Sequence, residues 1–148
     1  MNLKLTAKAA LQIQKPIDEV FEAIVNPDII TNYFIAKSSG RIETGKELIW
    51  EFGDFPGEFP VKVREVIANK SISFVWDEDT VVHITLDQQP DKSTVVKITE
   101  GDKELSEENL RWLTDNTSGW TNFLDCMKAY LEYGVYLRKG AFDYMKNG

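Results

Sequence analysis

The sequence predicts an α+β fold in which an antiparallel sheet packs against one long C-terminal helix. Large residues alternate with period two along most of the chain before residue 100, as in strands with one buried face. Turn-forming residues interrupt these runs at short intervals. A helical stretch follows over residues 106–134, and its apolar stripe recurs at steps of seven, four, three and four: Leu113, Trp120, Leu124, Met127 and Leu131. A one-sided sheet and a one-sided helix bury their apolar surfaces by packing face to face. Such packing leaves a wedge that a small molecule could occupy.

The N-terminal part of the chain predicts one strand and two short helices. Apolar residues occupy the odd positions from Leu3 to Ile13, which indicates a long, half-buried strand. Pro16 suits the start of a helix, where its missing N–H is not needed. Asn26-Pro27 ends that helix. A second short helix is expected from Asp28 to Asn32.

The middle of the chain predicts a meander of hairpins. In each run one parity carries the large apolar residues, and the opposite parity, which includes His83, carries polar ones. A break in parity near Arg64 and Glu65 indicates a β-bulge. The long helix that follows is expected to begin at Ser106, a favourable N-cap, with carboxylates in its first turn. The side chains assigned to the inner face of the sheet are Leu48, Trp50 and Phe52; Phe59, Val61 and Val63; Ile72, Phe74 and Trp76; Val82, Ile84 and Leu86; and Val96 and Ile98.

Composition limits the class of protein. With 148 residues and a net charge of −7, the chain is expected to form a single domain over residues 1–148, with the last few residues as a tail. Its one cysteine, Cys126, excludes an internal disulfide and favours a reducing compartment, so a cytoplasmic location is expected. The alternating N-terminus indicates neither a signal peptide nor a membrane span. Acidic charge without a Lys/Arg cluster argues against a nucleic-acid partner.

Two segments carry a resemblance to a known superfamily. They are KPIDEVFEAIVNP, with Pro16, Phe21 and Pro27, and SGWTNFLDCMKAYLEYG, with its Gly119-Trp120 pair. Together with the order of elements, they resemble the START-like (SRPBCC) superfamily, and within it the branch related to the activator of the heat-shock-protein-90 ATPase. The resemblance implies a helix-grip fold, in which a curved antiparallel sheet wraps around the last helix. It also implies a cavity for hydrophobic ligands in many members and a chaperone-docking role in a few.

Few residues suggest catalysis, and we expect no catalytic residues, no metal and no cofactor. His83 is the sole histidine, so neither a Cys/His metal cluster nor a Ser-His-Asp triad can be assembled. Among the carboxylates only Glu65 or Glu100 could turn inward, depending on the bulge and the strand register, and a solvated face is favoured over a catalytic role. Cys126 has no evident activating neighbour, which favours a buried, unreactive thiol.

The aromatic residues are the best candidates for a binding site. We expect Trp120 to anchor the helix on the sheet, so that its loss costs more stability than the loss of Trp50. The first functional hypothesis is noncovalent binding of a small hydrophobic or aromatic ligand. The second is an acidic, stress-linked module that docks on a chaperone or another cytosolic protein, and the third is a small-molecule cyclase or hydrolase. The residues expected to line a cavity are Phe34, Trp50, Phe52, Phe59, Trp76, Ile84, Trp112, Trp120, Phe123 and Met127.

Overall fold

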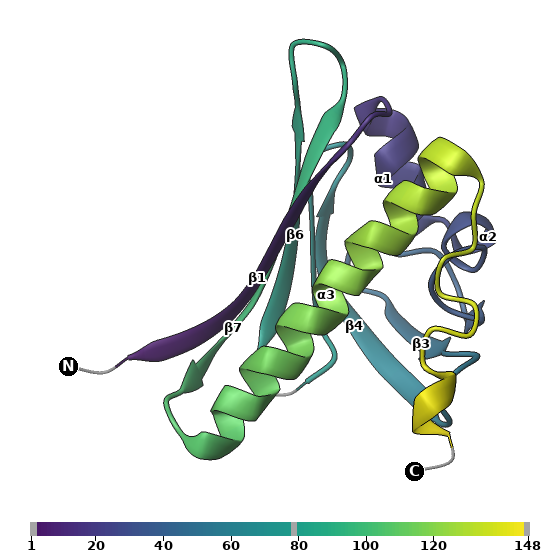
Figure 1. Cartoon of the computed structure of the whole chain (residues 1–148). Coiled ribbons are helices and arrows are strands. Elements are labelled where there is room, and N and C mark those ends of the chain that lie inside the picture. The colour runs from purple at the N-terminus through teal and green to yellow at the C-terminus, as the bar shows by residue number, and fades with distance from the viewer. Residues whose placement is uncertain (1–2, 78–79, 147–148) are drawn as a thin grey trace.

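The computed structural model describes residues 3–77 and 80–146, which form a seven-stranded antiparallel sheet with helices on one side (Figure 1). Across the sheet the strands follow the order β1-β7-β6-β5-β4-β3-β2. The sheet curves around α3, and α1 and α2 lie beside the C-terminal end of that helix (Figure 1). This arrangement confirms the predicted α+β, helix-grip fold. In chain order the elements are β1 (Lys4–Ile13), α1 (Ile17–Val25), α2 (Pro27–Ile30), β2 (Lys37–Ser38), β3 (Glu47–Glu51), β4 (Glu58–Ile67), β5 (Ser71–Val75), β6 (Val81–Gln88), β7 (Thr94–Glu104), α3 (Glu107–Tyr133) and a 3-10 helix (Asp143–Met145).

The N-terminal elements follow the predicted pattern, with one shift. In β1, Ala7 and Ile13 are buried while the even-numbered residues are mostly exposed. The second helix spans Pro27–Ile30, so it begins and ends earlier than the expected Asp28 to Asn32. The cause is local, because the Asn26 side chain accepts a hydrogen bond from the Asp28 N–H at 2.9 Å and caps the helix. Pro27 then takes the first helical position, where proline is well tolerated.

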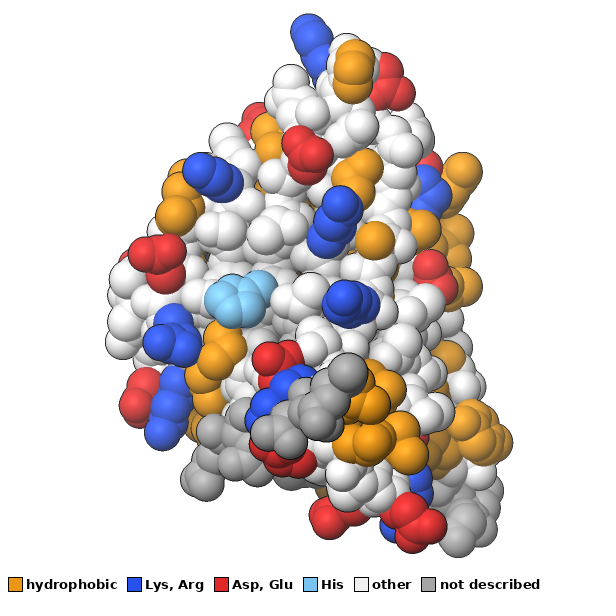
Figure 2. All heavy atoms as spheres, turned by 90° about the vertical axis from the view of Figure 1, so that its left-hand side faces the viewer, with side chains coloured by type: hydrophobic (Ala, Val, Ile, Leu, Met, Phe, Trp, Pro, Cys, Tyr) orange, Lys and Arg blue, Asp and Glu red, His pale blue; other side chains and the backbone are white. Residues whose placement is uncertain are grey.

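The hairpin meander has the predicted bulge. The β4–β5 register shifts between Val63 and Glu65, which returns Val66 to the side of Ile72. His83 is exposed on the outer face, as its parity predicts. Figure 2 shows this face, on which the histidine lies among scattered positive and negative side chains. Charges of both signs are therefore mixed on the outer surface seen in that view.

The core lies between the inner face of the sheet and α3. From the helix, Trp120, Phe123, Leu124, Cys126 and Met127 are buried. Leu113 and Leu131, at the two ends of the predicted stripe, are only half-buried. At the predicted start of the helix, the Ser106 hydroxyl accepts a hydrogen bond from the Asn109 N–H at 3.0 Å.

The chain reverses direction after α3. Gly134 caps the helix in the left-handed conformation with φ 67°, which glycine adopts without a steric penalty. Residues 134–146, which we call the C-terminal segment, then run back beside α2 towards β3 (Figure 1). The last two residues, part of the expected tail, lie outside the described residues.

Candidate functional site

Glu100 is a fully buried carboxylate held by four hydrogen bonds. Its Oε1 accepts from the indole N–H of Trp120 at 2.9 Å and from the side-chain amide of Asn116 at 2.8 Å. Its Oε2 accepts from the indole N–H of Trp76 at 3.1 Å and from the hydroxyl of Thr80 at 2.9 Å. A buried carboxylate is tolerated only where donors replace its lost water, and these four groups supply them.

Strand parity explains why Glu100 points inward. It shares its parity with Val96 and Ile98 on β7, and both of those side chains are buried. Glu65, the other carboxylate that the sequence allowed to turn inward, is exposed because the bulge after Val63 places Val66 on the inner side instead. The signal for Asn116 was also present in the sequence, since it precedes Trp120 by four residues and so shares its helix face.

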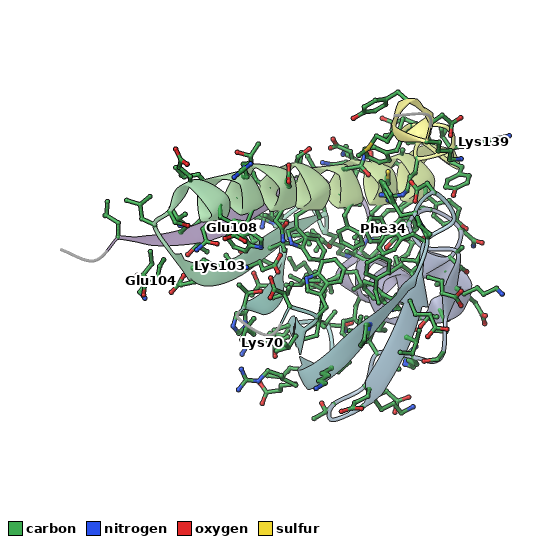
Figure 3. All side chains as sticks on the ribbon, turned by 90° about the horizontal axis from the view of Figure 1, so that it is seen from below. Phe34, Lys70, Lys103, Glu104, Glu108 and Lys139 are labelled. Carbon is green, nitrogen blue, oxygen red and sulfur yellow. The ribbon has the colours of Figure 1, made fainter. Side chains whose placement is uncertain are left out.

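A pocket of about 790 Å³ opens beside this carboxylate, between α3, the end of the sheet near β3 and β4, and the C-terminal segment. Three donors to Glu100, namely Trp76, Asn116 and Trp120, line the pocket, whereas Glu100 itself is shielded behind them. Figure 3 shows Phe34 beneath the C-terminal half of α3, at the end of the helix away from Lys103 and Glu108. The aromatic residues that line the pocket are Phe34, Phe52, Phe55, Phe59, Trp76, Trp120, Phe142 and Tyr144.

Five of the ten expected cavity residues line this pocket, and five do not. Those in the lining are Phe34, Phe52, Phe59, Trp76 and Trp120. Trp50, Ile84, Phe123 and Met127 belong instead to the core. Trp112 lies nearer the start of α3, where the Lys103 ammonium sits 5.0 Å from the centre of its ring.

Aromatic packing explains why the core residues stay behind the lining. The ring of Trp50 lies 6.5 Å from that of Phe34 and 6.0 Å from that of Trp76, both edge-on, so two lining residues cover it. Phe123 is covered in the same way by Phe34, at a centroid distance of 4.7 Å, and by Trp120, at 5.6 Å. Parity assigns a side chain to the inner face, but it carries no information on depth beneath that face.

The outer end of the pocket contains a guanidinium group that the sequence did not indicate. Arg138, from the C-terminal segment, lines the pocket and is 7% exposed. Its Nε lies 2.9 Å from Asp54 Oδ2, an ion pair without hydrogen-bond geometry, and its Nη2 donates to Asp54 Oδ1 at 3.2 Å. Its Nη1 donates to Asn122 Oδ1 at 3.0 Å. Ion pairing and hydrogen bonding thus compensate the buried charge.

Phenylalanine rings complete the surroundings of Arg138. Its guanidinium carbon lies 4.9 Å from the ring centre of Phe34, 5.2 Å from that of Phe52, 5.9 Å from that of Phe55 and 5.0 Å from that of Phe142. These distances are within the range of cation–π attraction. We call the group of Phe34, Phe52, Asp54, Phe55, Asn122 and Phe142 the Arg138 cage.

A second hollow of about 790 Å³ lies between α1 and the end of α3. Its lining combines Ile29, Tyr130 and Leu131 with three carboxylate residues of α1, Asp18, Glu19 and Glu22. It lacks the ring of aromatic side chains that surrounds the first pocket. The first pocket is therefore the better candidate for a ligand site.

The remaining candidates for chemistry do not converge on the pocket. His83 is on the outer face of the sheet. Cys126 is buried, and desolvation raises the pKa of its thiol to about 11, so the thiolate is disfavoured at neutral pH. Within residues 3–77 and 80–146, no group of three or more His, Cys, Asp or Glu side chains is arranged to hold a metal ion. No helix in the described part of the chain is both long and apolar enough to cross a membrane.

Comparison with known proteins gives one family match. The model of the family described as "Activator of Hsp90 ATPase homolog 1-like protein" matches residues 14–132, which begin directly after β1 and include all of α3 except its last residue. No curated protein sequence matches the chain.

Solved structures show the same fold. The protein SSP2350 from Staphylococcus saprophyticus is 30% identical with a TM-score of 0.82, over 90% of this chain and 96% of that one. The Aha1 dimer from Colwellia psychrerythraea is 19% identical with a TM-score of 0.76, over 88% and 98%. DynU16, described as a putative protein in the dynemicin biosynthetic locus, is 22% identical with a TM-score of 0.78, over 88% of this chain and 48% of that one.

Proposed function

Since the chain belongs to the family of Activator of Hsp90 ATPase homolog 1-like proteins, within the START-like superfamily, we propose that it binds a small hydrophobic or aromatic molecule between sheet and helix. The observation that carries the proposal is the aromatic pocket bounded by α3, the loop between β3 and β4, β4 and the C-terminal segment. Its volume of about 790 Å³ is within the range of small-molecule sites, which are mostly apolar with a few polar groups.

Glu100 supports an apolar or aromatic ligand. Both indole N–H groups of the lining, from Trp76 and Trp120, already donate to its carboxylate. The two tryptophans therefore offer a ligand the surfaces of their rings and not a hydrogen-bond donor. Ring stacking and apolar contact are then the main interactions available there.

The same hydrogen bonds argue against covalent chemistry at Glu100. A general base needs a free lone pair within reach of the proton that it removes. Each oxygen of Glu100 accepts two hydrogen bonds, and the side chain is 0% exposed. We therefore place Glu100 as a group that orients the lining, and the cyclase or hydrolase hypothesis stays last.

Gly119 permits a direct test of the pocket. It lines the pocket from within α3, and a Cβ at this position would have no atom within 4 Å. Gly119→Leu should extend a side chain into open space without displacing packed atoms. Because glycine inside a helix costs ~0.5–1 kcal/mol relative to alanine, both Gly119→Leu and the control Gly119→Ala should be at least as stable as the wild type.

The measurement is fluorescence titration with N-phenyl-1-naphthylamine, a neutral aromatic probe. We expect saturable binding to the wild type with energy transfer from tryptophan, similar binding to Gly119→Ala, and at least roughly tenfold weaker binding to Gly119→Leu, a loss of about 1.4 kcal/mol. Thermal unfolding checks that both variants remain folded. Equal binding by the wild type and a folded Gly119→Leu, or no binding by either, would contradict the proposal.

A protein-interaction role is the second candidate. The family description and the net charge of −7 support it, since acidic surfaces steer association with basic partners. Affinity purification of the tagged protein from its native cells at low salt tests this role, with chaperones as the first proteins to look for. Recovery of no protein above the background of an untagged control would reject it.

A further inference from the structure

The C-terminal segment has an inverted burial pattern. Within the described residues 134–146, Arg138 is the one buried side chain and Phe142 the one half-buried side chain. Apolar neighbours are exposed instead, including Val135, Tyr136 and Leu137, each close to half exposed. A charged residue is seldom the most buried group of a segment unless its partners hold it there. The segment is therefore anchored mainly by the guanidinium of Arg138.

The partners of Arg138 come mostly from outside the segment. The loop between β3 and β4 supplies Phe52, Asp54 and Phe55, the residue Phe34 follows α2, and α3 supplies Asn122. Phe142 is the one member of the cage that belongs to the C-terminal segment. The carboxylate and amide oxygens accept the N–H groups in the plane of the guanidinium, and the rings face its charge. Five of the six cage residues would thus remain in place if the segment detached.

Weak packing makes such detachment physically reasonable. Exposed segments with few buried side chains open at a small free-energy cost compared with global unfolding. When this segment opens, a carboxylate, an amide oxygen and three phenylalanine rings lose their cation together.

We propose that the Arg138 cage is a binding site for a guanidinium group, filled within the chain by Arg138 and open to a free alkylguanidinium when that side chain is absent or displaced. The site stands independently of the apolar ligand proposed above, although both share one end of the pocket. In this arrangement the C-terminal segment is a tethered ligand, and a guanidinium compound competes with it for the cage.

Chemical rescue tests the proposal. Arg138→Ala vacates the cage, and methylguanidinium is titrated while thermal unfolding is followed. We expect a saturable rise in the melting temperature of this variant, because at ten times its dissociation constant the ligand shifts the folded-to-unfolded ratio about tenfold. Methylammonium at equal ionic strength should give no such rise, since it lacks the planar set of donors. Arg41→Ala is the matched control, because Arg41 pairs with Glu22 outside any cage, and it should show no rescue.

A second measurement covers the case in which Arg138→Ala does not fold. Asp54→Asn keeps Arg138 and the rings but removes the paired charge, so trypsin should cleave after Arg138 and Lys139 several-fold faster than in the wild type. Asp143→Asn removes an exposed pair with Lys146 and should leave that cleavage rate unchanged. The proposal is overturned if methylguanidinium acts equally on folded Arg138→Ala and Arg41→Ala, or, where Arg138→Ala does not fold, if Asp54→Asn leaves cleavage at the wild-type rate.

Discussion

The carboxylate of Glu100 accepts two hydrogen bonds at each oxygen, and three of its donors, Trp76, Asn116 and Trp120, also line the pocket. It therefore connects the buried core to the lining of the pocket. Its side chain fixes the planes of two indole rings and holds the middle of α3 against β7.

Glu100→Gln should destabilise the protein by ~2–4 kcal/mol. The neutral side chain weakens charge-assisted hydrogen bonds, and its NH₂ group would face donors such as Asn116 or Thr80 where the structure requires an acceptor. Equilibrium urea unfolding measures the change. Glu104→Gln, at the exposed end of the same strand, is the control and should stay within ~0.5 kcal/mol of the wild type. Equal effects of the two variants would show that the buried network contributes nothing particular.

Cys126 gives a prediction about alkaline pH. Burial raises the pKa of its thiol from 9.0 to about 11, so between these values the unfolded chain releases a proton that the folded protein retains. The unfolded state is thereby favoured, and the free energy of unfolding should fall as the pH rises from about 9 to 11. In Cys126→Ala the urea midpoint should decline less steeply over this range. Some decline should remain, because burial also raises the pKa of Tyr33 well above its usual value. Identical slopes for the two proteins would contradict this assignment.

At the scale of elements, the seat of α3 on the sheet depends on Trp120. Its ring stacks on Trp76 at 5.2 Å and meets Phe123 edge-on at 5.6 Å, while its N–H binds Glu100. Trp120→Ala should therefore cost ~3–5 kcal/mol, with the hydrogen bond lost as well as the packing.

From the sequence, a milder loss is predicted for Trp50, on the premise that it lines the open end of a cavity. Trp50 is instead 2% exposed and covered by other rings, so the premise is wrong and Trp50→Ala should also cost ~3–5 kcal/mol. Trp120→Ala should still be the more damaging change, because it alone leaves a carboxylate oxygen of Glu100 short of a donor. Urea unfolding of both variants measures which one loses more unfolding free energy. A less stable Trp50→Ala would contradict this prediction.

Periodicity predicted the elements well because each strand has one solvated face. The buried side chains of β4, β5 and β6 have the predicted parity, and the bulge after Val63 lies where parity changes. Strand parity also allowed Glu100 to face inward. Its charge argued against burial, and the four hydrogen-bond donors that make the burial tolerable could not be identified from the sequence. Depth was not predictable, since the rings of Phe34 and Trp76 that cover Trp50 come together only in the assembled fold. Arg138 was missed because its segment has no periodic pattern, and its partners lie far away in the sequence.

At the scale of the whole molecule, the pocket lies where three parts of the chain meet. The sheet contributes ring surfaces, α3 contributes Trp120 and the open position at Gly119, and the C-terminal segment closes one side with Arg138. Within the lining, the side-chain amide of Asn116 and the indole N–H groups of Trp76 and Trp120 already donate hydrogen bonds to Glu100. This arrangement supports the proposal that a ligand binds here through ring stacking and apolar contact.

Native mass spectrometry of the protein, purified gently from its native cells, tests this central claim most directly. We predict a wild-type species heavier than the bare chain by the mass of one small molecule, which organic extraction releases. Gly119→Leu, prepared in the same way, should carry much less of it because the new side chain occupies the pocket. A wild-type protein with only the mass of the bare chain, or an equal added mass on both proteins, would contradict ligand binding at this pocket.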